Sequence, residues 1–295
     1  MEKDLKFIDT NIIHKRKTVE GLIQVYEYNN YKLPLPTEIE ISNSGTCNRK
    51  CIFCPRSDPD FKDIKEFISE ELIQKVTNEL SSLDYYGVFR FSGFVEPMLD
   101  KNIYTCIKYI KDTLPKCRIE LITNGDPLNK KRLKKLFENG LDKLLISAYD
   151  GEESVKKFQN MIDDCKLKED QYIIRNRFLP EKDDFGITLN NRAGMMENAE
   201  FKISNISVPS NNPCYIPSYT LLFDYLGDVL LCPNDWGKKY ILGNLKNETL
   251  LDIWFGEKNI EYRKKLASGN RKFSPCNVCD VNGTLIGEPN ANYYK

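Results

Sequence analysis

The chain has 295 residues, of which 41% are hydrophobic and 29% charged, and its 43 basic and 43 acidic residues balance to no net charge. This balance argues against nucleic acid as a partner, and no apolar run reaches the roughly 20 residues that a membrane-spanning helix needs. The first residues lack the apolar core of a signal peptide, so we expect a cytoplasmic protein with one large domain and a small appendage.

Cysteine and histidine usage narrows the chemistry. Ten cysteines in a chain without a secretory signal indicate metal or redox work rather than a disulfide framework. The only histidine is His14. With so little imidazole, hydrolytic triads and histidine-based metal sites are excluded.

Residues 1–36 form an N-terminal extension, which we expect to be irregular or to hold a small hairpin at residues 22–28. Residues 38–41, Glu-Ile-Glu-Ile, then alternate as a strand does. This strand leads directly into a loop that is rich in cysteine.

That loop places Cys47, Cys51 and Cys54 in a C-x3-C-x2-C pattern, with no fourth cysteine nearby. It suits zinc poorly, because zinc sites close tetrahedrally and use C-x2-C pairs. An iron–sulfur cubane has four irons and takes four ligands. Three thiolates on one loop therefore leave one iron open to a small chelating molecule.

After this loop, strands and helices alternate. We expect strands over residues 88–91, 118–122, 143–147 and 172–174, and helices over residues 69–80, 103–110, 130–137 and 155–162. Such βαβ units build a parallel sheet, so residues 37–180 are predicted to form an α/β domain, a partial (β/α) barrel of the TIM type. In barrels the functional loops follow the carboxyl ends of the strands. The cysteine loop, Ser92-Gly93, Asn124-Gly125 and Ser147 all fall there.

A second set of cysteines follows a connecting segment of residues 181–213. Cys214 and Cys232 bracket a predicted hairpin, and Cys276 and Cys279 form a C-x2-C pair on a later helical turn. Four thiolates from separated segments make a closed site, which spacing alone assigns equally to structural zinc or to a fully ligated cubane. Beside the C-x3-C-x2-C loop a second cluster is the better interpretation, and residues 214–295 would form a small hairpin-plus-helix domain with a tail.

From about residue 37 to residue 282 the chain resembles radical S-adenosylmethionine (SAM) enzymes that carry a C-terminal twitch domain, a shortened SPASM domain. Within that group it is most similar to members that oxidise a ring hydroxyl in aminoglycoside biosynthesis. The matching segments are Cys-Asn-Arg-Lys-Cys-Ile-Phe-Cys-Pro, Glu96-Pro97, Thr123-Asn124-Gly125-Asp126, Asn191-Arg192-Ala193-Gly194, Gly243-Asn244-Leu245 and Asp252-Ile253-Trp254. The three further cysteines of a full SPASM domain are absent, so the resemblance implies one auxiliary cluster.

The resemblance also implies roles for residues around SAM. The three loop cysteines would hold a [4Fe–4S] cluster with SAM on its open iron, and Phe53 would pack on the adenine. Glu96 would meet the SAM amino group, although Val95 stands where the family has a small residue. Asn124 and Ser147, at strand ends, would face SAM.

Two residues are expected at the substrate. Arg192 matches a family arginine that reaches the substrate, and a bidentate hold on substrate oxygens suits it better than a role as base, because guanidinium hardly loses its proton. Asp235, shortly after Cys232, is a candidate polar contact or proton acceptor.

Together these features predict an oxidoreductase. A low-potential donor such as flavodoxin or ferredoxin would reduce the first cluster, and SAM cleavage would give a 5′-deoxyadenosyl radical. This radical would abstract hydrogen from a hydroxyl-bearing carbon of a sugar or cyclitol. The auxiliary [4Fe–4S] cluster at Cys214, Cys232, Cys276 and Cys279 would then accept an electron and give a ketone, since cubane potentials span roughly −700 to +450 mV.

Three other functions compete with this one. A radical SAM epimerase of a carbohydrate or peptide would need a cysteine hydrogen donor, for which Cys106, Cys117 and Cys165 are candidates, although their positions favour core packing. A peptide-maturing enzyme would usually carry a longer recognition domain than the 36 residues of the extension. A non-catalytic electron-transfer or zinc-stabilised protein would not need an open iron.

Overall fold

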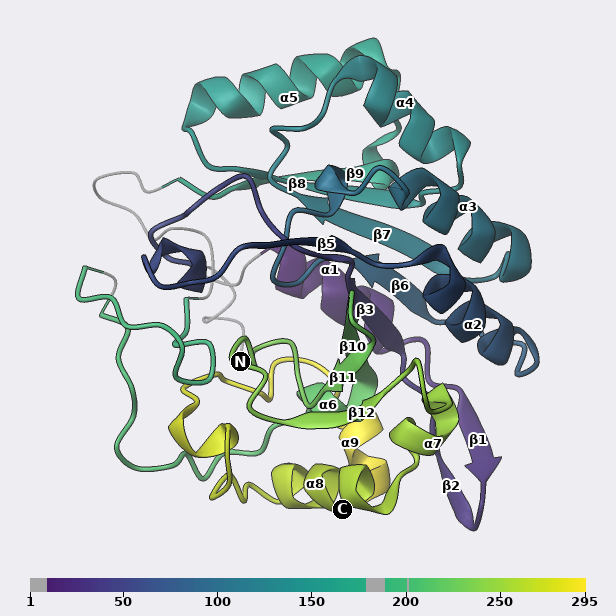
Figure 1. Cartoon of the computed structure of the whole chain (residues 1–295), viewed down its shortest axis with the longest axis vertical. Coiled ribbons are helices and arrows are strands. Elements are labelled where there is room, and N and C mark those ends of the chain that lie inside the picture. The colour runs from purple at the N-terminus through teal and green to yellow at the C-terminus, as the bar shows by residue number, and fades with distance from the viewer. Residues whose placement is uncertain (1–9, 179–188, 201) are drawn as a thin grey trace.

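The computed structural model describes residues 10–178, 189–200 and 202–295. Its centre is an eight-stranded sheet with the strand order β12-β11-β10-β3-β6-β7-β8-β9 (Figure 1). Strands β3 and β6 to β9 pair in parallel, as do β10 and β3. The predicted α/β architecture is therefore confirmed.

The barrel half follows the expected strand–helix alternation. Its strands are β3 (Glu38–Ser42), β6 (Val88–Phe91), β7 (Arg118–Thr123), β8 (Lys143–Ala148) and β9 (Tyr172–Asn176). Its helices are α2 (Glu70–Ser81), α3 (Ile103–Thr113), α4 (Lys130–Glu138) and α5 (Glu152–Asp164). Ser69 caps α2, because its hydroxyl accepts a 3.2 Å hydrogen bond from the backbone N–H of Leu72.

The two faces of this sheet differ in chemistry. Ile39 and Ile41 of β3 belong to the main apolar cluster together with Leu72 and Val76 of α2. Side chains of a strand alternate between faces, so the acidic side chains between them point to the opposite face. There Glu38 and Glu120 flank Arg90, at 2.7 and 2.8 Å, and all three are buried.

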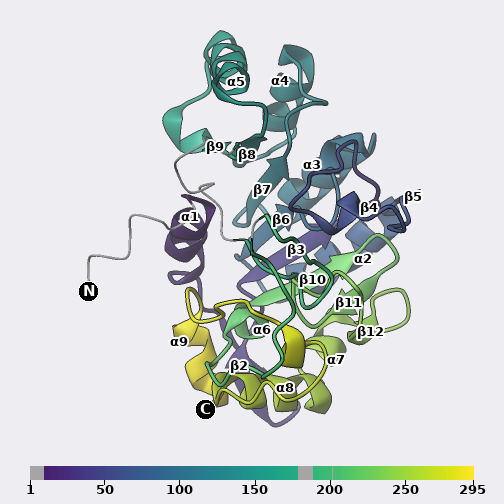
Figure 2. The ribbon, with the colours of Figure 1, turned by 90° about the vertical axis from the view of Figure 1, so that its left-hand side faces the viewer.

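The N-terminal extension corrects one prediction. Residues expected to be irregular form helix α1 (Thr10–Val19), which lies against the sheet on the side away from α2 (Figure 2). The predicted hairpin is confirmed, with strands β1 (Val25–Tyr28) and β2 (Tyr31–Pro34). On either side of the cysteine loop, β4 (Ser44–Gly45) and β5 (Ile64–Phe67) make a small antiparallel ladder.

The predicted C-terminal hairpin is present but does not stand alone. Strands β10 (Thr220–Asp224) and β11 (Asp228–Leu230) meet at Gly227, whose φ of +87° favours glycine. Because β10 pairs with β3, the hairpin and β12 (Ile241–Asn244) extend the barrel sheet.

Four helices accompany the hairpin, namely α6 (Ile216–Tyr219), α7 (Leu250–Trp254), α8 (Glu257–Ala267) and α9 (Glu288–Ala291). The predicted helical turn is present at Cys276–Val278. Within the ranges that the structure describes, no helix has the length and apolar character to span a membrane. Part of the predicted connecting segment, residues 181–188, lies outside the described residues.

Candidate active site

The cysteine loop brings Cys47, Cys51 and Cys54 together beyond the carboxyl end of β3. All three thiols are free and partly exposed, and the backbone N–H of Cys54 donates to the carbonyl of Cys51 at 2.9 Å. Burial, together with the neighbouring Cys54 and Cys47, raises the pKa of Cys51 to about 12. Three thiolates this close repel one another, so the loop suits a cationic iron cluster that would offset their charge.

Glu96 follows β6 in the chain. Its side chain lies next to the cysteine loop and against the end of β7. Its carboxylate accepts hydrogen bonds from the hydroxyl of Thr123 and the backbone N–H of Asn124, both at 2.7 Å, and from the backbone N–H of Met98 at 3.0 Å. Glu96 is buried, and burial raises its pKa to about 7 despite these bonds. An ammonium group placed here would favour the ionised carboxylate.

Three of the four predicted SAM contacts, Glu96, Asn124 and Ser147, line one cavity of about 120 Å³, which we call the inner cavity, whereas Phe53 lines a larger cavity beside it. The lining of the inner cavity includes Cys47, Cys51, Val95, Glu96, Asn124, Ser147 and Tyr149. The Asn124 side chain donates to the carbonyl oxygen of the Asn48 side chain at 2.7 Å, which turns Asn124 toward the cysteine loop. The inner cavity is thus lined both by the cysteine loop, which would leave one iron of a cluster open, and by polar groups that could bind the amino-acid part of a ligand.

Phe53 stacks on Tyr149, with ring centroids 5.5 Å apart and planes at 29°. Nearby, Arg175 donates to the Ser147 hydroxyl at 2.5 Å. Tyr149 was not predicted from the sequence. It follows Ser147 at the end of the same strand, and this position at a strand end was the reason for predicting Ser147. An aromatic pair at this edge offers a flat surface for a base such as adenine.

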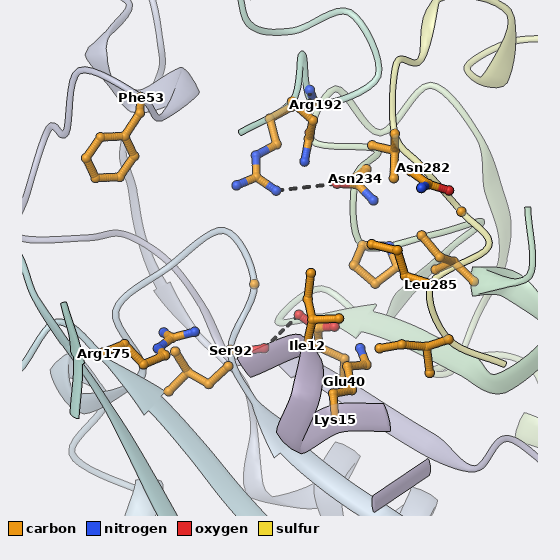
Figure 3. Close-up of a pocket in the computed structure, with 18 of the residues that line it drawn as sticks. Ile12, Lys15, Glu40, Phe53, Ser92, Arg175, Arg192, Asn234, Asn282 and Leu285 are labelled. Carbon is orange, nitrogen blue, oxygen red and sulfur yellow. Dashed lines mark hydrogen bonds between the residues drawn. The ribbon is translucent and has the colours of Figure 1, made fainter. Parts of the chain in front are cut away.

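A larger cavity of about 360 Å³, the central cavity, adjoins the inner one and shares Ser92, Gly93, Ile122 and Tyr149 with it. It draws its walls from α1, the barrel strands and the C-terminal segment. Figure 3 shows Arg192 and Asn234 across this cavity from Ser92 and Glu40.

Arg192 reaches the central cavity from a tight turn. Its backbone φ is +47°, which is uncommon for a residue other than glycine and marks a functional candidate. The guanidinium donates to the Asn234 side-chain oxygen at 3.3 Å, and its Nε has no hydrogen-bond partner in the described part of the chain. Burial takes the guanidinium out of water and thereby lowers the pKa of Arg192. An oxygen of a bound ligand would replace the hydrogen bonds to water that the guanidinium has lost.

Asp235 lies outside the lining of the central cavity. Its two carboxylate oxygens accept the backbone N–H groups of Lys239 at 2.9 Å and of Tyr240 at 2.8 Å, and the residue is fully buried. Asp235 therefore holds the turn after Cys232, and its neighbour Asn234 is the residue that lines the cavity.

Glu40 served in the sequence only to predict a strand. In the structure it is the acidic residue among the described residues that line the central cavity. It accepts a 2.6 Å hydrogen bond from the Ser92 hydroxyl and is buried. Burial raises the pKa of Glu40, while Lys15 lowers it.

The second cysteine set is buried in the C-terminal domain. Burial raises the pKa of Cys232, and Cys276, Cys279 and Cys214 raise it further, which places the four thiols within electrostatic reach of one another. Buried Arg271 lies close enough to lower the pKa of three of them. Four mutually repelling thiolates beside a guanidinium suit an iron–sulfur cluster.

Comparison with known proteins assigns a family to each of the two domains. The radical SAM superfamily model matches residues 41–164, and that of the SPASM iron–sulfur cluster-binding domain matches residues 214–280. The SAM-dependent 2-deoxy-scyllo-inosamine dehydrogenase of Niallia circulans is 31% identical over 243 residues, covering 82% of this chain and 92% of that protein. The chain belongs to the radical SAM superfamily.

Solved structures agree with this assignment. The crystal structure of BtrN with AdoMet and 2-DOIA has a TM-score of 0.72 and 29% identity, covering 86% of this chain and 96% of that one. The AdoMet-bound anSMEcpe structure shares the fold, with a TM-score of 0.55, 15% identity and coverage of 88% and 92%. The family binds a [4Fe–4S] cluster with SAM in its first domain, and the SPASM-type domain binds an auxiliary iron–sulfur cluster.

Proposed function

We propose that this chain is a radical SAM dehydrogenase that oxidises a secondary hydroxyl of a sugar or cyclitol to a ketone. One observation carries the proposal: Phe53, from the SAM cysteine loop, and Asn234, two residues after Cys232, line the same central cavity. A ligand in this cavity would lie between the two cysteine sites. The dehydrogenase from Niallia circulans supports the reaction class.

Cys47, Cys51 and Cys54 would hold the first [4Fe–4S] cluster, and the four buried cysteines of the C-terminal domain would hold a second. When bound, SAM and the clusters supply one-electron chemistry: hydrogen loss from the substrate carbon and acceptance of a second electron, which polar side chains alone cannot perform. Glu96, Asn124 and Ser147 would orient SAM in the inner cavity, and Phe53 would contact it from the adjoining central cavity.

Arg192 and Asn234 would hold the substrate ring. Their hydrogen bond fixes the guanidinium against one wall of the cavity. The Arg192 Nε, which has no hydrogen-bond partner in the described part of the chain, would donate to an oxygen of the ligand. A planar guanidinium can bind two oxygens at once, which orients a ring so that one C–H bond faces the inner cavity.

Glu40 would accept the hydroxyl proton that leaves as the ketone forms. We assign this role to Glu40 instead of Asp235, because the Asp235 carboxylate accepts hydrogen bonds from two backbone N–H groups whereas Glu40 lines the cavity. Burial raises the pKa of Glu40 toward the range in which a carboxylate is an effective base near neutral pH.

The chain would work with a low-potential electron donor such as flavodoxin or ferredoxin. Ten free thiols support a reducing compartment, the cytoplasm.

Epimerisation is the weaker alternative. It would need a thiol beside the substrate, and neither Cys106, Cys117 nor Cys165 lines the central cavity in the described structure. Burial raises the pKa of Cys106 and of Cys117 to about 12, as expected of core thiols.

The test is anaerobic incubation of the reconstituted protein with SAM, a reductant and a panel of ring polyols, without NAD. We expect ketone and 5′-deoxyadenosine in equal amounts. The Cys276→Ala/Cys279→Ala variant should still cleave SAM but form no ketone. Absence of ketone across the panel would count against the proposal.

A further inference from the structure

Helix α1 is a fixed wall of the central cavity. His14 Nε2 lies 2.7 Å from Glu120 in the sheet, and Arg16 Nε donates to the carbonyl of Leu285 in the C-terminal segment at 2.8 Å. Ile12 and Lys15 of this helix line the cavity (Figure 3). The helix precedes residues 41–164, where the match to the radical SAM superfamily begins.

Lys15 brings a positive charge into this wall. Its Nζ lies 2.5 Å from Glu38, whose side chain is fully buried, and 5.4 Å from the ring centroid of Tyr219. Lys15 is also close enough to Glu40 to lower its pKa, against the larger effect of burial, which raises it. Glu38, Arg90, Ser92 and Tyr219 also interact with Glu40.

Most of the charged residues that line the cavity are basic. In the described part of the chain, the charged residues that line it are Lys15, Arg175, Arg177, Arg192 and Glu40. Glu40 is therefore the one acidic residue among the described lining residues, and Lys15 stands beside it. An ammonium group on a ligand that approached Glu40 would be repelled by Lys15 over a short, poorly hydrated distance.

We propose that Lys15 is a specificity-determining residue that excludes ring substrates carrying an ammonium group. The substrate then presents a hydroxyl, not an amino group, to Glu40. This inference rests on the proposed function, because it names the substrate class of the same cavity. It sets the chain apart from the Niallia circulans relative, whose name gives 2-deoxy-scyllo-inosamine, an amine, as its substrate.

The test compares two ligands that differ in one group, scyllo-inositol and scyllo-inosamine. Their binding to the reconstituted, SAM-loaded, unreduced protein is measured by calorimetry. We expect the wild type to bind the inositol about tenfold or more tightly than the inosamine. In Lys15→Met the ratio should fall to about threefold or less, because the repelling charge is gone.

Two further variants control for structure. Lys17→Met removes an exposed lysine of the same helix and should keep the wild-type ratio. Lys15→Met/Glu38→Gln removes both charges of this ion pair, leaves Arg90 paired with Glu120, and should behave as Lys15→Met does. Thermal unfolding and iron content show whether each variant is folded and loaded.

The proposal is overturned if the wild type binds the inosamine as tightly as the inositol, if Lys15→Met keeps the wild-type ratio, or if neither ligand binds. Ketone formation is assayed separately. The expected binding ratios without ketone would reject the proposed reaction and keep the role of Lys15. Ketone formed from the inosamine as readily as from the inositol would reject that role and keep the reaction.

Discussion

The backbone N–H of Asn124 donates a 2.7 Å hydrogen bond to the buried carboxylate of Glu96. This bond ties the end of β7 to the segment after β6, beside the cysteine loop, whose Cys47 lies 3.9 Å from the Asn124 side chain. The groups proposed to hold SAM therefore form one connected unit, in which the charge of Glu96 is the part that recognises an amino group.

Glu96→Gln should weaken SAM binding about tenfold or more, because the amide keeps its shape but loses the charge that pairs with the amino group. Equilibrium dialysis of SAM against reconstituted protein measures this. In the wild type the affinity should fall as pH drops below the Glu96 pKa of about 7, since protonation removes the same charge. Unchanged affinity in the variant, with a flat pH profile in the wild type, would exclude Glu96 from SAM binding.

Arg192→Lys should raise KM for the ring substrate about tenfold or more, with a smaller effect on kcat. Lysine keeps the positive charge but cannot bind two oxygens in the fixed geometry of a guanidinium. SAM binding serves as the internal control and should not change. A KM equal to that of the wild type would show that Arg192 does not hold the substrate.

Glu40→Gln should lower kcat by about 10²–10⁴-fold, the usual contribution of a general base. The wild-type rate should fall at low pH, where Glu40 becomes protonated, and this acid limb should lie above the ordinary glutamate pKa because burial raises the pKa of Glu40. The acid limb should disappear in the variant. If kcat and its pH profile are retained, another group takes the proton.

Arg90→Met should destabilise the fold by about 3–5 kcal/mol, because it leaves the buried carboxylates of Glu38 and Glu120 without their shared cation. Urea unfolding measures the change. The control is Lys108→Met, which removes one partner of an exposed pair on α3 and should shift stability by about 0.5 kcal/mol or less. Similar losses for both variants would contradict this role for Arg90.

Sequence patterns predicted the elements that have a local signal. Helix α2 was predicted from its apolar stripe and its cap at Ser69, and the hairpin from Gly227 between two apolar runs. Cysteine spacing predicted the cluster sites because ligand count and spacing limit which metal can bind.

The features that were missed depend on partners far away in the chain. Helix α1 lacks an apolar stripe, since His14 and Lys15 face buried acids of the sheet rather than an apolar core. Glu40 lies on an alternating strand, and only the folded sheet brings its side chain to the central cavity. Asp235 was chosen for its place after Cys232, but hydrogen bonds with its own turn engage its carboxylate.

The central claim, oxidation with a second cluster as electron acceptor, is tested most directly by measuring iron, sulfide and zinc in the anaerobically reconstituted protein. We predict about eight irons per chain without zinc, and about four in the Cys47→Ala/Cys51→Ala/Cys54→Ala variant. About four irons with one zinc in the wild type would contradict the account, because the buried site could then accept no electron.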